Sequence, residues 1–237
     1  VIPEARDDIK VEVLTTNPSL PLQVCQMGER VIVDGDLDRK IRNCSSRTVT
    51  VSGVGEIAFA DLPQILIRTP LKVAMGAGGA VFGSIGRSDQ LSFSHAGCGD
   101  WTIANVKTRL ELKQAGSGDA RVGTAGEADI SLAGSGDVKT QAVSGRLKVN
   151  LMGSGNVTAA SVAGPVDVSI AGSGDVRIDG GVATSVSAQI AGSGDVEFRG
   201  STRTLKARIA GSGDVRAREV TGEVNKQVMG SGTVIIG

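Results

Sequence analysis

The stretch A-G-S-G-D at residues 115–119 decides the fold, because close copies of it return along the rest of the chain. The first glycines of these copies are spaced by 18 to 20 residues and lie at Gly97, Gly116, Gly134, Gly153, Gly172, Gly192, Gly211 and Gly230. A fixed period in this range indicates one small structural unit stacked on copies of itself, each covering the apolar face of its neighbour. The repeat therefore predicts a fold, but by itself it does not indicate an activity.

Apolar and polar residues alternate before each glycine corner, as at Val166, Val168 and Ile170. Strict alternation is typical of a half-buried strand. A second short apolar segment follows the corner, and a third break, usually glycine, follows that segment. Three short strands and three corners in about 19 residues leave no room for a helix of ordinary length. We therefore predict an all-β fold, a parallel β-helix (solenoid) with about 19 residues per coil.

The repeat is absent from the first quarter of the chain. Residues 1–60 carry β-rich segments and are predicted to form an irregular N-terminal cap on a regular solenoid at residues 61–237, within one continuous domain. Glycine corners at 53–56 and 76–79 are taken as the first of the series, which makes a rod of ten corners, about 50 Å long. The last strand, 233–237, carries no cap signal, so we expect end-to-end association or coverage by the N-terminal segment.

An acidic residue closes most copies of the repeat, and these residues are the one ligand-binding candidate that the repeat offers. They are Asp100, Asp119, Asp137, Asp175, Asp195 and Asp214, with Asn156 in the same series. Stacking would place them in a ladder of like charges, which basic residues two positions later are expected to offset; these are Arg121, Lys139, Arg177 and Arg216.

The favoured role for these aspartates is that of turn residues whose carboxylates accept main-chain N–H groups of their own turns. A calcium ladder is the alternative, because glycine-rich phrases that end in Asp also occur in calcium-binding β-rolls. Those β-rolls have a nine-residue period, however, and each coil here would supply only one acid. We therefore predict no metal site and no cofactor.

Three cysteines and one histidine are the other chemically notable residues. Cys25 and Cys44 lie in the N-terminal region and are the candidate disulfide if the compartment is oxidising. Cys98 takes the serine place of the first corner and is expected to act as a small corner residue rather than a reactive thiol. His95 falls in the inward column one coil from Gln114, which predicts a buried, hydrogen-bonded His–Gln pair. The sequence offers no Ser-His-Asp set, paired-histidine zinc motif or G-x-S-x-G phrase.

Composition argues against several classes of partner. Twenty-five Lys and Arg balance 25 Asp and Glu, so we expect no nucleic-acid binding. Four Phe, one Trp and no Tyr leave little capacity to stack on bases or sugar rings. No apolar run approaches the roughly 18 residues of a membrane-spanning helix. The first residue is Val1 rather than methionine, so we expect a processed chain whose targeting signal has been removed.

The sequence L-K-V-A-M-G-A-G at residues 71–78, followed by A-G-S-G-D-V at 133–138, 171–176, 191–196 and 210–215, resembles the putative auto-transporter adhesin, head GIN domain family. The resemblance covers about residues 60–237. It implies a bacterial, extracytoplasmic right-handed β-solenoid in the periplasm, at the cell surface or secreted. It brings no catalytic residues with it.

Together these observations predict a non-enzymatic, extracytoplasmic β-solenoid that is adhesin-like or associated with the envelope. Its expected partners are a surface glycan, an envelope component or, through the solenoid end, a second copy of itself. The alternative is a polysaccharide-active β-helix enzyme, a lyase or hydrolase. A groove lined by acids from several coils would favour the enzyme, whereas three flat polar faces would favour the binding protein.

Overall fold

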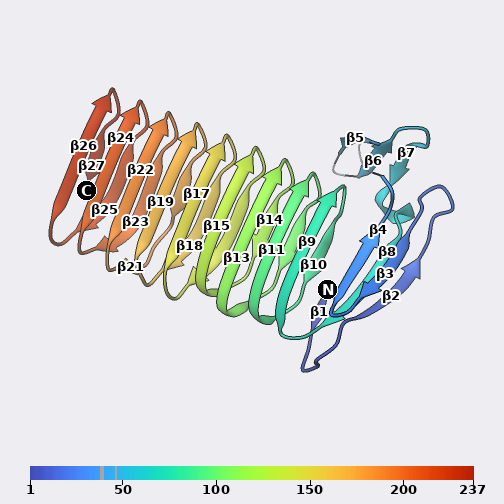
Figure 1. Ribbon diagram of the computed structural model, residues 1–237. Coiled ribbons are helices and arrows are strands. Elements are labelled where there is room, and N and C mark those ends of the chain that lie inside the picture. Colours follow the sequence, from blue (N-terminus) through green and yellow to red (C-terminus); the bar gives the residue numbers. More distant parts are fainter. Residues whose placement is uncertain (38–39, 46) are drawn as a thin grey trace.

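The computed structural model describes residues 1–37, 40–45 and 47–237. It shows an elongated stack of parallel coils with an irregular region at the N-terminal end (Figure 1). The stack makes about nine turns of about 19 residues each, which confirms the predicted all-β solenoid. A single 3₁₀ turn, η1 (Phe59–Asp61), is the one helical element in the described ranges, and none of these residues form a helix long and apolar enough to cross a membrane.

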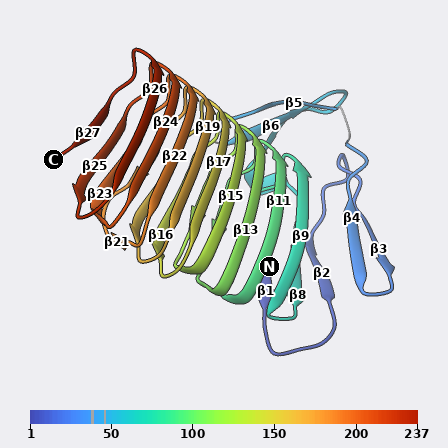
Figure 2. The ribbon, with the colours of Figure 1, turned by 60° about the vertical axis from the view of Figure 1, so that its left-hand side comes forward.

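One side of every coil is a long strand that ends at the glycine corner. These strands are β9 (Lys72–Gly79), β11 (Ser88–Gly97), β13 (Val106–Gly116), β15 (Ala125–Gly134), β17 (Leu147–Gly153), β19 (Val166–Gly172), β22 (Val186–Gly192), β24 (Leu205–Gly211) and β26 (Val224–Gly230). Each lies beside the next along the stack (Figure 2) and pairs with it in parallel. Equivalent residues lie opposite one another, such as Leu147 and Val166. The predicted coil-to-coil register of the repeat is therefore observed directly.

Shorter strands form the remaining sides of the coils. They are β10 (Gly83–Ile85), β12 (Trp101–Ile103), β14 (Ala120–Val122), β16 (Val138–Val143), β18 (Val157–Val162), β20 (Val176–Ile178), β21 (Val182–Ala183), β23 (Val196–Thr202), β25 (Val215–Val220) and β27 (Val234–Ile236). The coil from Gly172 to Gly192 contains three separate strands, as the sequence predicts. In β16, β18, β23 and β25 the second and third segments run on as one strand.

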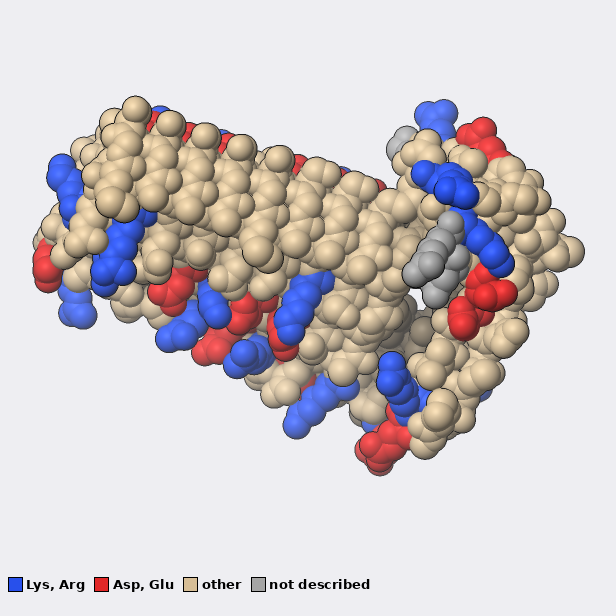
Figure 3. All heavy atoms as spheres, turned by 45° about the horizontal axis from the view of Figure 1, so that its top comes forward, with Lys and Arg blue, Asp and Glu red and all other residues tan. Residues whose placement is uncertain are grey.

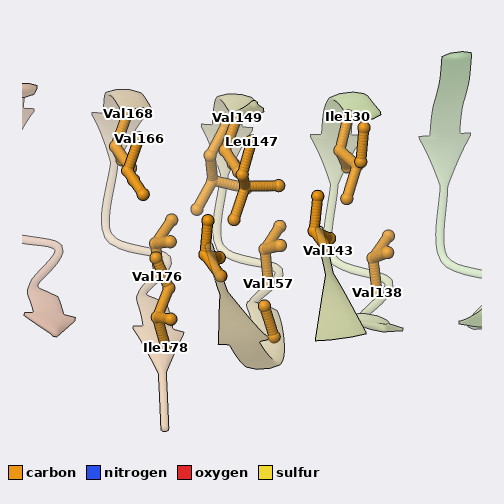
Figure 4. Close-up of a cluster of buried hydrophobic side chains, with 14 of the residues drawn as sticks. Ile130, Val138, Val143, Leu147, Val149, Val157, Val166, Val168, Val176 and Ile178 are labelled. Carbon is orange, nitrogen blue, oxygen red and sulfur yellow. The ribbon is translucent and has the colours of Figure 1, made fainter. Parts of the chain in front are cut away.

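The interior of the stack is filled by the alternating apolar side chains (Figure 4). Ile130, Val149 and Val168 of the long strands are at most 2% exposed, and Val157 and Val176 of the short strands are 1% exposed. Burying one such side chain contributes roughly 1.5–3 kcal/mol. Because every coil repeats the pattern, the core is a continuous column of aliphatic side chains.

The glycine corner is what lets the coils approach closely. Gly172 has φ 139°, and a Cβ there would overlap the carbonyl oxygen of Gly153 in the preceding coil. That oxygen accepts the N–H groups of Ser173 and Gly174 at 3.0 and 3.1 Å. A side chain at position 172 would be incompatible with this backbone contact, which explains why glycine recurs there.

The N-terminal region consists of short sheets outside the stack. They contain β1 (Ile2–Pro3), β2 (Lys10–Thr15) and β8 (Gln64–Thr69); β3 (Gln23–Met27) and β4 (Arg30–Asp34); and β5 (Ile41–Cys44), β6 (Thr48–Val51) and β7 (Gly55–Ala58). Parallel stacking starts only at β9, so β8 belongs to the N-terminal sheets although the sequence boundary at residues 60/61 placed it in the solenoid.

The two early glycine corners have different outcomes. Gly79 pairs with Gly97, so the corner at 76–79 belongs to the series, as predicted. The corner at 53–56 joins β6 and β7, which are antiparallel, so its assignment as a coil corner was wrong. A hairpin turn and a coil corner both need glycine with positive φ, and the sequence alone does not separate them.

The N-terminal region packs against the first coil. A second apolar cluster around Leu20, Val49 and Ile57 includes Ala80 and Phe82 of the stack. The rings of Phe59 and Phe82 lie 4.1 Å apart between centroids. The C-terminal strand β27 lies at the opposite end (Figure 1). The expectation that the N-terminal segment covers that strand was therefore wrong.

A disulfide joins the N-terminal region to the stack between Cys44 and Cys98, whose Cα atoms are 6.1 Å apart. The predicted Cys25–Cys44 pair was wrong, because Cys25 lies on β3, in a different sheet from β5, and its thiol is free and exposed. Cys98 was expected to be only a small corner residue. The sequence feature that could have indicated a disulfide is that Cys98 replaces the serine found at the other corners of the repeat.

Candidate functional site

The structure brings the predicted aspartates into one ladder along the glycine corner. Oδ1 of Asp100 accepts the main-chain N–H of Asp119 at 2.9 Å, and Oδ1 of Asp119 accepts that of Asp137 at 2.9 Å. The same contact continues through Asp175, Asp195 and Asp214 up to the N–H of Thr233. The acceptor role was predicted, but its donor was not: each carboxylate binds the next coil rather than its own turn.

Asn156 shows that the ladder requires an acceptor more than a charge. Its N–H and side-chain Nδ2 donate to Oδ1 of Asp137 at 2.9 and 3.0 Å, and its own Oδ1 accepts the N–H of Asp175 at 3.1 Å. A neutral amide thus makes the same inter-coil contact as a carboxylate. The ladder is accordingly a device that fastens one coil to the next.

The basic residues do not form the continuous neutralising row that was expected. Arg216 pairs with Asp195 at 3.1 Å and Asp214 at 2.6 Å. Arg177 instead contacts Asp179 and Glu197. Asp214 has a pKa below its usual value, first because Thr233 donates hydrogen bonds to it and then because of the Arg216 charge. Hydrogen bonds from N–H groups, found at every step, offset the acidic charge more generally than ion pairs do.

The described part of the chain contains no group of three or more His, Cys, Asp or Glu arranged to hold a metal ion. In the ladder, one oxygen of each aspartate is already engaged by an N–H group. A calcium ion with 6–8 oxygen ligands would have to gather its ligands from several coils.

His95 lies inside the first coils, 2% exposed and opposite Gln114, which confirms its inward position. The predicted hydrogen bond between the two was wrong, because Nε2 of Gln114 donates to the carbonyl oxygen of Gly118 in its own corner. Both ring nitrogens of His95 lack a partner, as does Nε1 of Trp101, whose ring centroid is 6.3 Å away. Burial lowers the pKa of His95.

The outward side of the long strands carries a row of apolar residues in register, six alanines and two methionines. Its members are Ala96, Ala115, Ala133, Met152, Ala171, Ala191, Ala210 and Met229. The exposed corner serines from Ser117 to Ser231 lie beside it. We call the alanine–methionine row and these serines the uncharged band. Figure 3 shows such a surface along the stack, with charged side chains at its margins.

The neighbouring outward row of the same strands is polar, with two basic residues among its members. It contains Ser94, Lys113, Ser131, Asn150, Ser169, Gln189, Arg208 and Gln227. Where the two rows meet on β9 to β17 there is a shallow depression of about 480 Å³, lined among others by Gly76, Ser94, Ala115, Ser131 and Met152. Its lining residues include Lys113 but no carboxylate.

A second surface hollow, of about 560 Å³, spans the corners between β8 and β17. Arg87, Asp89, Asn105, Lys107 and Thr124 line it, together with small apolar residues, and Asp89 is the one acid in this lining. The groove lined by acids from several coils that would favour a polysaccharide-cleaving enzyme is therefore not found at either depression.

The fold and these rows define a β-solenoid repeat protein with a hydrogen-bonded corner ladder and an uncharged band along one outer side. Residues 139–237 match the family described as putative auto-transporter adhesin, head GIN domain, which confirms the sequence resemblance over that segment. No curated protein and no solved structure matches the chain. The solenoid fold fits an adhesin head, and an adhesin family favours an extracellular or cell-surface location.

Proposed function

We propose that this protein is a rigid, non-enzymatic binding module of the bacterial cell envelope that holds a surface glycan on its uncharged band. The observation that carries the proposal is the regular alanine–methionine row with a shallow depression at the β9–β17 end. A flat face of this kind admits an extended polymer, whereas a monomeric substrate would need an enclosed pocket.

The chemistry of the neighbouring rows suits a hydroxyl-rich polymer. Ser131, Asn150 and Ser169 present hydroxyl and amide groups on successive strands, at the spacing of about 4.8 Å between strands. Each hydrogen bond to a sugar contributes little in water, and few aromatic rings are present to strengthen it. Repetition along the stack compensates, because many weak contacts to one polymer act together.

The absence of paired carboxylates from the lining of both depressions supports binding rather than cleavage. Glycosidic hydrolysis ordinarily needs two carboxyl groups that flank the bond. The Cys44–Cys98 disulfide supports an exported protein, because disulfides persist in oxidising compartments such as the periplasm and the cell surface.

The test is co-sedimentation of the protein with insoluble peptidoglycan sacculi, together with binding to immobilised lipopolysaccharide. Ala115→Arg places a long charged side chain in the depression, and Ala160→Arg places the same side chain on the exposed side of β18 as a matched control. We expect Ala115→Arg to weaken binding and Ala160→Arg to leave it unchanged.

Equal binding by both variants, or binding to neither material, would contradict the proposal. Release of reducing ends from either material by the unmodified protein would support the enzyme instead.

A further inference from the structure

Lys226 occupies a core position in the last long strand. In β26, residues 224, 226 and 228 take the inward register positions, because they pair with the buried residues Leu205, Ala207 and Ile209 of β24. Every earlier coil has an apolar residue at the position of Lys226. These residues are Met75, Phe93, Leu112, Ile130, Val149, Val168, Ala188 and Ala207.

β26 is the last long strand of the described stack, and Lys226 is exposed there. The inward positions flanking Lys226 remain open, with Val224 38% and Val228 39% exposed, and Ile236 of β27 is 44% exposed. Covering the strand with another coil would take the ammonium group out of water without an acid to pair with it, which is costly.

We propose that Lys226 prevents the open edge of β26 and β27 from stacking on the same edge of a second copy. A strand edge with free N–H and C=O groups, flanked by exposed apolar side chains, is otherwise a template for such pairing. An inward-pointing charge is a known means of blocking it. The end-to-end association that we expected from the sequence should therefore occur only when Lys226 is replaced.

A second copy is the occupant that the geometry favours. Two copies related by a twofold axis can pair β26 with β26 of the other copy, antiparallel, with both inward faces on the same side. A head-to-tail contact is blocked, because the N-terminal region already covers the first coil through Phe59 and Phe82. The apolar edge can therefore be covered by an identical edge.

Three registers of that pairing are each unfavourable. Pairing all of Val224–Gly230 places Lys226 opposite Val228 of the other copy, inside the shared core. A shift by two residues places the two Lys226 side chains opposite each other, where like charges repel. A shift by a single residue places the inward side chains of one copy on the outward side of the shared sheet. None of these three registers keeps the apolar residues buried and the lysines hydrated.

The experiment replaces Lys226 by the residue found in the two preceding coils, as Lys226→Ala. Lys206→Ala, on the exposed outward side of β24, removes the same charge away from the core column and is the matched control. Sedimentation equilibrium and light scattering should show a monomer for the unmodified protein and for Lys206→Ala. Lys226→Ala should form a dimer, with a dissociation constant lowered at least about tenfold.

A second change locates the contact. Adding Val228→Lys to Lys226→Ala restores a charge on the same inward face and should return the protein to a monomer. The proposal is overturned if Lys226→Ala associates no more than the unmodified protein, if the unmodified protein is already an end-to-end dimer, or if the double variant still associates. Melting curves of each variant confirm that the coil stack is folded.

Discussion

The coil stack and the N-terminal region are both made of short β-strands, but different contacts hold them in place. In the stack, each strand pairs in parallel with its equivalent one coil away, and inward residues are almost fully buried, as in β19. In the N-terminal region the hairpins are mostly antiparallel, and all five residues of β3 are exposed. Among the described residues, its apolar cluster has four buried members, and a disulfide ties it to the first coil.

The difference shows how repetition distributes stability. A coil in the stack is supported by two neighbours of the same shape, so that each corner and ladder residue contributes a contact that recurs along the rod. The N-terminal region depends on a few unique contacts. Substitutions of the same kind should therefore have different effects in the two regions, and the following predictions are ordered by the size of the expected effect.

The largest expected effect is at a glycine corner. Gly172→Ala forces a Cβ into the carbonyl oxygen of Gly153 and requires alanine at φ 139°, so we expect a loss of at least about 3 kcal/mol of unfolding free energy. The matched control is Gly53→Ala in the hairpin turn, where φ is 82° and a Cβ would contact nothing within 4 Å. There the cost should be about 1 kcal/mol. Thermal melts of both variants measure the two losses of unfolding free energy. Equal losses would contradict the expected difference between a coil corner and a hairpin turn.

The disulfide should stabilise the N-terminal region rather than the stack. Replacing Cys44 and Cys98 by serine removes a cross-link over a separation of 54 residues, and we expect a local loss of about 2–4 kcal/mol. Limited proteolysis should cut residues 1–69 faster while the melt of the stack changes little. Cys25→Ser is the control. Without reductant, alkylation should label one thiol, on Cys25; a peptide linking Cys25 to Cys44 would refute this assignment.

His95 should make the first coils sensitive to acid. Because its pKa is lowered in the folded protein, the neutral form is favoured there. Protonation of His95 therefore favours the unfolded state. The folded protein keeps its full stability above the unfolded pKa of about 6.5, and it loses stability as pH falls below that value. Asp100 is the charged group that opposes the shift. His95→Leu, which copies Leu132 in the same column, should remove this pH dependence and add about 1–2 kcal/mol at neutral pH. An unchanged pH profile of the melting temperature would contradict this role.

The ladder makes the smallest contribution per residue. Asp137→Ala leaves the N–H of Asn156 without its acceptor and should cost about 1 kcal/mol, whereas Asp137→Asn keeps an acceptor, as Asn156 does, and should cost much less. Calcium and chelator should leave the melting temperature of the unmodified protein unchanged. Equal losses for the two variants would show that charge matters rather than hydrogen bonding, and a rise with calcium would make the ladder a metal site.

Much of the architecture could be predicted because the repeat places equivalent residues at a constant separation. The alternation of Val166, Val168 and Ile170 sets the inward side, and Gly172 sets the corner, through local backbone conformation alone. The ladder of aspartates followed from the same period. The acceptor role of Asp137 was predicted, but its donor lies in the coil above and is defined only once the coils are stacked.

The sequence by itself determined the coil, its corners and its rows, since these depend on short-range periodicity and on the conformational freedom of glycine. Tertiary structure alone decided which cysteine meets Cys44, that Gln114 contacts Gly118 rather than His95, and that the turn at 53–56 joins antiparallel strands. It also decided that the inward Lys226 lies on an open edge. These outcomes depend on unique contacts between segments that have no common period, and periodicity carries no information about them.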